Sequence, residues 1–216
     1  MSADFVAVME DVLEVYAEPY DPRRPKGNFD ETNKQLIKET RLPLPAQPGQ
    51  PQRFDYAYER NGTRNLFLFV EPQAGRRHVH VTEQRTKLDF AYEMQWLVDE
   101  GDPEADVIRV VLDNLNTPKI ASLYEAFEPA EARRIARKLA LHYTPKHGSW
   151  LNMAEIELSV LQHQCLDRRI PDEVTLTREI AAWEYQRNAE QATIDWRFSV
   201  SDARHKLERL YPSLPS

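Results

Sequence analysis

The 216-residue sequence lacks the features of an extracellular or membrane protein. Its one cysteine, Cys165, excludes an internal disulfide and a thiolate zinc cluster, and we expect it to be a small buried apolar residue. No apolar run approaches the roughly 20 residues of a membrane span. The N-terminus is acidic, unlike a signal or transit peptide. These absences predict a cytoplasmic protein with no membrane partner.

The sequence also lacks the basic excess that is typical of proteins that bind nucleic acids. Its formal net charge is -7. DNA is not excluded as a partner, because a metal-dependent nuclease carries acidic ligands that its ions neutralise. Local basic clusters occur at residues 23–24, 76–78, 133–138 and 168–169. Each cluster is typical of a solvated surface, and a DNA contact is the alternative interpretation.

The N-terminal part of the chain has the pattern of one helix followed by strands. Residues 4–17 have helical spacing, and a strand is predicted to end at Asp30, with residues 34–38 either continuing it or starting a hairpin. Prolines in residues 40–53 predict an extended loop. Two strand patterns follow, joined by Asn61-Gly62, which predicts a hairpin turn, and a third strand is expected. These three strand patterns cover residues 54–59, 65–70 and 78–81.

Helices and strands alternate in the rest of the chain. The nearly continuous apolar run at residues 107–112 predicts a central parallel strand buried on both faces. Thr117-Pro118 has the pattern of a helix start, with threonine as the N-cap. A short strand is expected at residues 141–143. Helices are predicted at residues 87–100, 131–140, 150–165, 172–190 and 201–210.

Together these patterns predict an α/β protein. We expect a mixed five-stranded sheet, with three antiparallel strands plus parallel strands, flanked by helices. Acidic residues at the ends of two strands suit a ribonuclease H-like fold. We divide the chain into an N-terminal helix and linker (residues 1–25), a catalytic domain (26–170, with the proline-rich loop 40–53) and a helical extension packed on it (171–216).

Three carboxylates are the candidate site. Asp30 and Asp113 each follow a predicted strand, so the sheet would hold them while they face solvent at its edge. Glu155 lies in the predicted helix 150–165, on a polar seam between two apolar stripes, where its charge needs a metal or a basic partner. Glu157, on the other polar strip, is the competing candidate. Two strand-end carboxylates and one from a helix can bind hard divalent metals and support phosphoryl chemistry.

Several motifs carry a family resemblance. Residues 113–117 (DNLNT) followed by residues 147–155 (HGSWLNMAE) resemble the catalytic core of DDE transposases, specifically bacterial insertion-sequence transposases related to the mariner superfamily. Residues 29–32 (FDET), 58–63 (YERNGT) and 165–171 (CLDRRIP) match as well. The resemblance therefore covers nearly the whole chain.

The resemblance implies a metal-dependent reaction on DNA. Asp30, Asp113 and Glu155 would be the catalytic residues and would hold two Mg²⁺ or Mn²⁺ ions. One ion would activate water and later a DNA 3′-hydroxyl, and the other would stabilise the leaving oxygen. Hydrolysis at the ends of a mobile element and strand transfer into target DNA would share this site. Four neighbouring polar residues are candidate DNA contacts: Asn114, Lys146, His147 and Asn152.

The resemblance also implies partners. These are DNA, as transposon ends and as target, and a second copy of the chain in a homodimer assembled on DNA. The sequence begins at the helix leading into the catalytic domain, without the family's helix-turn-helix module, and a separate helix-turn-helix chain is a candidate partner. A bacterial protein that joins the nucleoid when bound to DNA is expected.

Two departures from the family pattern leave a second function open. Lys26-Gly27-Asn28 stands where an apolar strand is usual, and these residues are poor in a central buried strand, so Asp30 is expected to be loosely held. Pro118 replaces a common histidine. The alternative is therefore a non-catalytic descendant that binds DNA or a protein partner. An unrelated ribonuclease H-like nuclease is a third interpretation.

Overall fold

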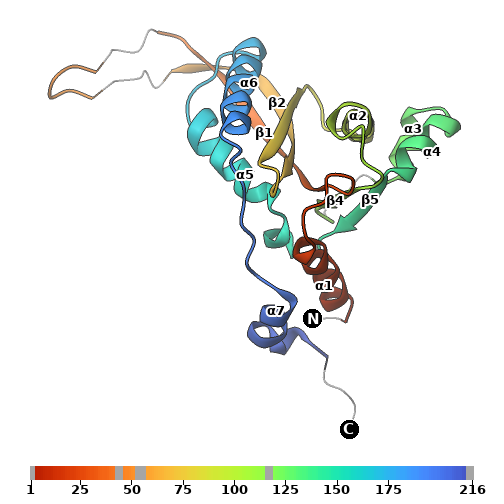
Figure 1. The fold of residues 1–216 in the computed structure, drawn as a ribbon. Coiled ribbons are helices and arrows are strands. Elements are labelled where there is room, and N and C mark those ends of the chain that lie inside the picture. Colours follow the sequence, from red (N-terminus) through yellow and green to blue (C-terminus); the bar gives the residue numbers. More distant parts are fainter. Residues whose placement is uncertain (1–2, 42–45, 52–56, 115–118, 213–216) are drawn as a thin grey trace.

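A mixed five-stranded sheet forms the centre of the protein (Figure 1). The computed structural model describes residues 3–41, 46–51, 57–114 and 119–212. The strand order is β3-β2-β1-β4-β5, with β3, β2 and β1 antiparallel and β1, β4 and β5 parallel, as predicted. The strands are β1 (Lys26–Glu39), β2 (Tyr58–Glu71), β3 (Arg76–Thr82), β4 (Ile108–Leu112) and β5 (Leu139–Tyr143).

Helices cover both faces of the sheet. Helices α2 to α4 lie on one side, α5 and α6 lie on the other, and α1 and α7 lie together at one end (Figure 1). No helix in the described part of the chain is both long and apolar enough to cross a membrane. The helices are α1 (Ala3–Ala17), α2 (Lys87–Trp96), α3 (Ala121–Ala126), α4 (Pro129–Arg137), α5 (Ala154–Leu161), α6 (Glu173–Ala189) and α7 (Val200–Lys206). Helices α2 and α5 continue as π-helical turns at Leu97–Gly101 and Gln162–Leu166, and short 3₁₀ turns occupy Ser149–Leu151 and Glu208–Leu210.

Alternation along β2 divides the core between the two faces. Leu66, Leu68 and Val70 pack with α5 and α6, whereas Phe67 and Phe69 pack with α2 and α3. All five residues of β4 are buried, which confirms the predicted central strand. The sheet is therefore covered on both faces, and it can hold polar groups rigidly where its strands end.

The predicted hairpin at Asn61-Gly62 is wrong, and β2 is longer than predicted because it runs through Gly62. Strand β1 continues past Asp30 to Glu39, so residues 34–38 extend this strand, which is one of the two predicted alternatives. Asn61 and Gly62 together face one residue of β1, Leu36, and Gly62 has φ 89°. The glycine therefore makes a β-bulge in a continuous ladder instead of a turn. The C-terminal end of β1 and the N-terminal end of β2, which pair with each other, extend beyond the body of the molecule (Figure 1).

The segment Lys26-Gly27-Asn28 forms the buried start of β1, so the prediction that it weakens this strand is wrong. A Cβ on Gly27 would lie 2.0 Å from Cζ of Phe69, so glycine makes room for that ring. The ammonium of Lys26 donates to the carbonyl of Glu18, and the Asn28 amide nitrogen donates to the Tyr16 hydroxyl and to Oδ1 of Asn152. Each of these three residues fits the strand because of a contact with another part of the fold: Gly27 with Phe69, Lys26 with Glu18, and Asn28 with Tyr16 and Asn152.

The remaining helix boundaries differ modestly from the predictions. Helix α5 begins at Ala154, not Trp150, because the 3₁₀ turn and Asn152 precede it. Helix α4 ends at Arg137 and β5 begins at Leu139, slightly earlier than predicted. The predicted helix start at residues 117–118, and with it the departure at Pro118, lies outside the described residues.

Candidate active site

Asp30 and Asp113 lie side by side at one edge of the sheet. In the parallel pairing of β1 with β4, Phe29 is paired with Leu112, and the two aspartates directly follow this pair. Neighbouring strands are about 4.8 Å apart. Strand β1 continues past the end of β4, so Asp30 has no paired residue on the β4 side. The half-buried carboxylates of both residues therefore share one open edge.

Thr144 fixes the second aspartate. It follows β5 directly, its N–H donates to the Leu112 carbonyl at 2.9 Å, and its hydroxyl donates to Oδ1 of Asp113 at 2.8 Å. Thr144 is 1% exposed. Sequence reasoning did not identify this residue. The available signal was a polar residue immediately after a strand, at the same edge as Asp113.

Asn152 places the start of α5 against β1. Its Nδ2 donates to the Phe29 carbonyl at 3.0 Å, and its Oδ1 accepts from the N–H of Ala154 at 3.1 Å. Glu155, in the first turn of α5, is therefore held next to the strand that carries Asp30, with its own side chain exposed. The predicted DNA contact at Asn152 does not fit a side chain that is 1% exposed, and we assign it a positioning role.

Glu155 and Glu157 have opposite environments, and this separates the two candidates. Glu157 is fully buried, with Arg187 donating two hydrogen bonds of 3.0 Å to its carboxylate. Nε of Arg77 lies 3.0 Å from its Oε1, as an ion pair without hydrogen-bond alignment. One of the two predicted apolar stripes of this helix is not fully buried, because Ile156 is 44% exposed. The buried charge that needs a partner is Glu157, and Glu155 is left available for a ligand.

Several acidic side chains gather at the carboxylate edge. Burial raises the pKa of Asp30 to about 7, and repulsion from Glu31, Asp113 and Glu155 adds to this, although a hydrogen bond from the Glu31 N–H opposes it. Within the described residues, no lysine or arginine pairs with Asp30 or Glu155. A cation at this edge would relieve the repulsion.

The donor set fits a hard divalent ion. Asp30, Asp113 and Glu155 offer carboxylate oxygens, which Mg²⁺ and Mn²⁺ prefer. As the side chains stand, no three His, Cys, Asp or Glu residues of the described ranges gather at ligand distance. Binding an ion would therefore require these carboxylates to rotate towards one another.

The raised pKa of Asp30 predicts a pH dependence for the metal-free protein. The folded state keeps the Asp30 proton up to pH about 7, whereas the unfolded chain loses it near the ordinary aspartate pKa of 3.8. The free energy of unfolding should therefore fall as pH rises through this interval, with a slope of up to about 1.4 kcal/mol per pH unit from this group. Urea unfolding with a chelator at several pH values measures it. The Asp30→Asn variant should lack this component and be more stable than wild type at pH 8. Identical pH profiles for the two proteins would contradict the account.

Three of the four predicted DNA-contacting residues are exposed near this edge. The turn Pro145–Gly148 is closed by a hydrogen bond of 2.7 Å from the Gly148 N–H to the Pro145 carbonyl, with His147 at φ 67°. Lys146 and His147 therefore project outward, and with Asn114 they line a groove against α1.

Comparisons with known proteins agree with this fold. A family model described as "DDE superfamily endonuclease" matches residues 28–177. The search of curated proteins found no match. The structure is similar to the Mos1 mariner transposase chain in a paired-end complex with Mn (TM-score 0.52, 12% identity) and in one with Mg (TM-score 0.52, 14% identity). Each of these two matches covers 89% of this chain and 60% of the Mos1 chain. The Mos1 strand transfer complex has a TM-score of 0.51 at 13% identity, covering 87% of this chain and 56% of that chain.

These likenesses confirm the ribonuclease H-like α/β fold predicted from the sequence. The chain spans less than two thirds of the length of the Mos1 chains. The family match runs from the start of β1 into α6 and includes all three candidate carboxylates. The chain belongs to the DDE superfamily endonucleases.

Proposed function

We propose that this chain is the catalytic domain of a transposase. It would hydrolyse DNA phosphodiester bonds at the ends of a mobile element and join the freed 3′ ends to target DNA. The observation that carries the proposal is the pairing of Phe29 with Leu112, which brings Asp30 and Asp113 to one edge, next to the start of the helix bearing Glu155.

The chain's own residues would supply binding and orientation. Asp30, Asp113 and Glu155 would hold two Mg²⁺ or Mn²⁺ ions. When bound, such ions supply activation of the attacking oxygen and stabilisation of the leaving oxygen. Thr144 and Asn152 keep Asp113 and α5 in place through hydrogen bonds, of which that of Asn152 is buried. Exposed Lys146, His147 and Asn114 would contact the DNA backbone beside the cleaved bond.

The proposed partners follow from the same reasoning. The similar Mos1 structures are described as a paired-end complex with the left transposon end and as a strand transfer complex. For this chain we propose transposon-end and target DNA as substrates, a homodimer on DNA, and a helix-turn-helix module as the DNA reader. The net charge of -7 is consistent with a domain that binds DNA weakly without metal and without such a module.

The non-catalytic alternative has lost its main structural support. It depended on a weak first strand, on the missing helix-turn-helix module and on the acidic net charge. The first of these no longer supports it, because Gly27 and Asn28 lie in a continuous, well-paired β1. It is now an outcome of the experiment that follows.

Nicking of supercoiled plasmid DNA in Mn²⁺ tests the proposed function. Wild-type protein should convert supercoiled DNA to open circles in a metal-dependent way, and Asp113→Asn should reduce the rate by about a hundredfold or more, since a metal site contributes several kcal/mol to such a reaction. Glu104→Gln, the same carboxylate-to-amide change on an exposed residue before β4, at the end of that strand opposite Asp113, is the control and should cut normally. No metal-dependent nicking by wild type, or full activity of Asp113→Asn, would favour the non-catalytic alternative.

A further inference from the structure

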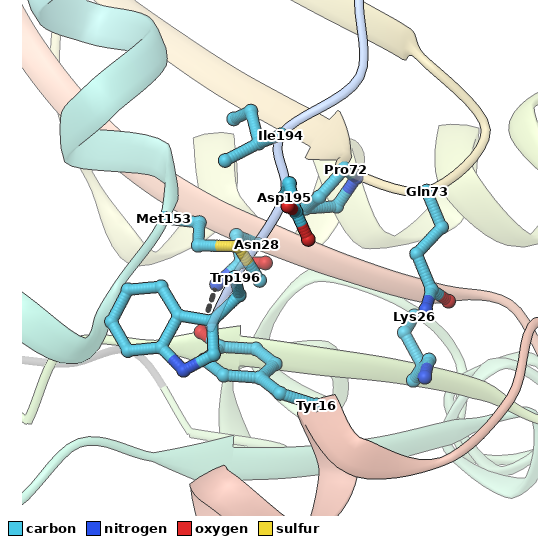
Figure 2. A pocket seen from close by; sticks show the side chains of 9 residues that line it. All are labelled: Tyr16, Lys26, Asn28, Pro72, Gln73, Met153, Ile194, Asp195 and Trp196. Atoms are coloured by element: carbon cyan, nitrogen blue, oxygen red, sulfur yellow. Dashed lines mark hydrogen bonds between the residues drawn. The ribbon is translucent and has the colours of Figure 1, made fainter. Parts of the chain in front are cut away.

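A buried hydrogen-bond network joins three segments of the chain directly behind the carboxylate edge. Its members are Tyr16 of α1, Asn28 of β1 and Asn152 before α5, and we call it the amide–phenol network. The Asn28 amide donates to the Tyr16 hydroxyl and, at 3.2 Å, to Oδ1 of Asn152. The Tyr16 hydroxyl donates to the Leu151 carbonyl at 2.7 Å. Figure 2 shows the Tyr16 and Asn28 side chains meeting, with the dashed line between them.

The network controls the relative position of two candidate ligands. Asn28 is two residues before Asp30 on the same face of β1, and Asn152 is three residues before Glu155. The network and the bond from Asn152 to the Phe29 carbonyl therefore connect the backbone of β1 to that of α5 at these points. A change in the network would alter the separation of Asp30 and Glu155.

Hydrogen bonds, more than packing, hold the network. Asn28 and Asn152 are each 1% exposed, and the Asn28 amide uses its nitrogen for two acceptors. Beside them lies a cavity of about 90 Å³ lined by Tyr16, Asn28, Met153 and Trp196, among others (Figure 2). Side chains next to a cavity are not confined by close packing on that side. The Tyr16 hydroxyl therefore keeps the Asn28 amide in its orientation, together with Oδ1 of Asn152.

The C-terminal segment completes this arrangement from the outside. The Trp196 ring lies 5.2 Å from the Tyr16 ring, centroid to centroid, and its Nε1 donates to the Phe198 carbonyl at 2.7 Å. The segment that leads into α7 thereby packs against the Tyr16 ring of α1. Helix α1 and the segment before α7 thus meet at Tyr16, a member of the amide–phenol network.

We propose that Tyr16 and Asn28 are positioning residues that set the divalent-ion affinity of the carboxylate edge. They act through Asn152 on Asp30 and Glu155 and touch neither ion nor DNA. This inference rests on the proposed function, since it assumes that the edge binds divalent ions. Groups that orient metal ligands from behind typically change metal affinity 10- to 100-fold when removed.

The test compares Mn²⁺ binding to the intact chain by isothermal titration calorimetry and electron paramagnetic resonance. Tyr16→Phe removes one hydroxyl and keeps the ring, and it should weaken Mn²⁺ affinity about tenfold. Tyr211→Phe is the matched control, because it removes a hydroxyl bonded to Glu10, outside the network, and should bind Mn²⁺ as wild type does. Asn28→Ala, as a second variant, should weaken binding at least as much as Tyr16→Phe.

The outcomes separate this inference from the proposed function. If wild type binds Mn²⁺ and Asp113→Asn does not, but Tyr16→Phe and Asn28→Ala bind within twofold of wild type, the positioning role is overturned and the proposed function stands. A lower melting temperature of Tyr16→Phe with unchanged Mn²⁺ affinity would also overturn it, by showing a purely structural role. If wild type binds no Mn²⁺, the positioning role and the proposed function are both overturned.

Discussion

Glu155→Gln is expected to abolish DNA nicking while leaving the fold intact. The substitution keeps the size of the side chain and removes the negative charge that would face the ions. A metal site contributes several kcal/mol to phosphodiester cleavage, so the nicking rate should fall by about a hundredfold or more. The rate of open-circle formation in Mn²⁺ measures this.

The stability of the same variant serves as its control. Glu155 is exposed, and its charge adds to the repulsion that raises the pKa of Asp30. Without metal, Glu155→Gln should therefore unfold at the same denaturant concentration as wild type or a slightly higher one. A variant that both unfolds early and loses activity would show that Glu155 is structural, and nicking at the wild-type rate would remove it from the site.

Glu157→Gln is expected to have the opposite effect and to destabilise the fold by about 3–5 kcal/mol, the usual consequence of removing one member of a buried ion pair. Glu157 is fully buried and joins three elements: its own helix α5, β3 through Arg77 and α6 through Arg187. Neutral glutamine would leave the buried Arg77 guanidinium without a compensating charge. Burial already lowers the pKa of Arg77, and the charge of Glu157 opposes this effect.

The two glutamates form a matched pair, two positions apart on one helix and changed by the same chemistry. Urea unfolding should move the midpoint of Glu157→Gln far below that of Glu155→Gln. At a temperature where Glu157→Gln remains folded, it should still nick DNA in Mn²⁺. Equal midpoints for the two variants would contradict the assignment of Glu157 as the buried anchor of α5.

Much of the fold was predictable because it depends on local pattern. The apolar run of β4 predicts a strand buried on both faces, and the apolar residues of β2 predict a buried strand, and both are found. The Asn61-Gly62 hairpin was not predictable as a bulge, since the same dipeptide serves both and only the continuing partner strand decides between them. The suitability of Gly27 likewise depended on Phe69 from β2, which no local rule identifies.

The site was predictable in part for the same reason. The position of Asp113 followed from the end of its strand. Asp30 lies beside it for a different reason from the predicted one, because β4 ends there while β1 continues. The contrast between Glu155 and Glu157 needed the arginines of β3 and α6, which lie 80 and 30 residues from Glu157 in sequence. Thr144 and Tyr16 were missed because their partners, Asp113 and Leu151, are brought to them only by the folded sheet.

The most direct test of the central claim is an anomalous difference map from crystals soaked in Mn²⁺. The account predicts anomalous peaks at the edge where β1 and β4 separate, with carboxylate oxygens of Asp30, Asp113 and Glu155 at ligand distance and Glu157 remaining bound to Arg187. Peaks elsewhere on the protein, or none at this edge at millimolar Mn²⁺, would contradict it.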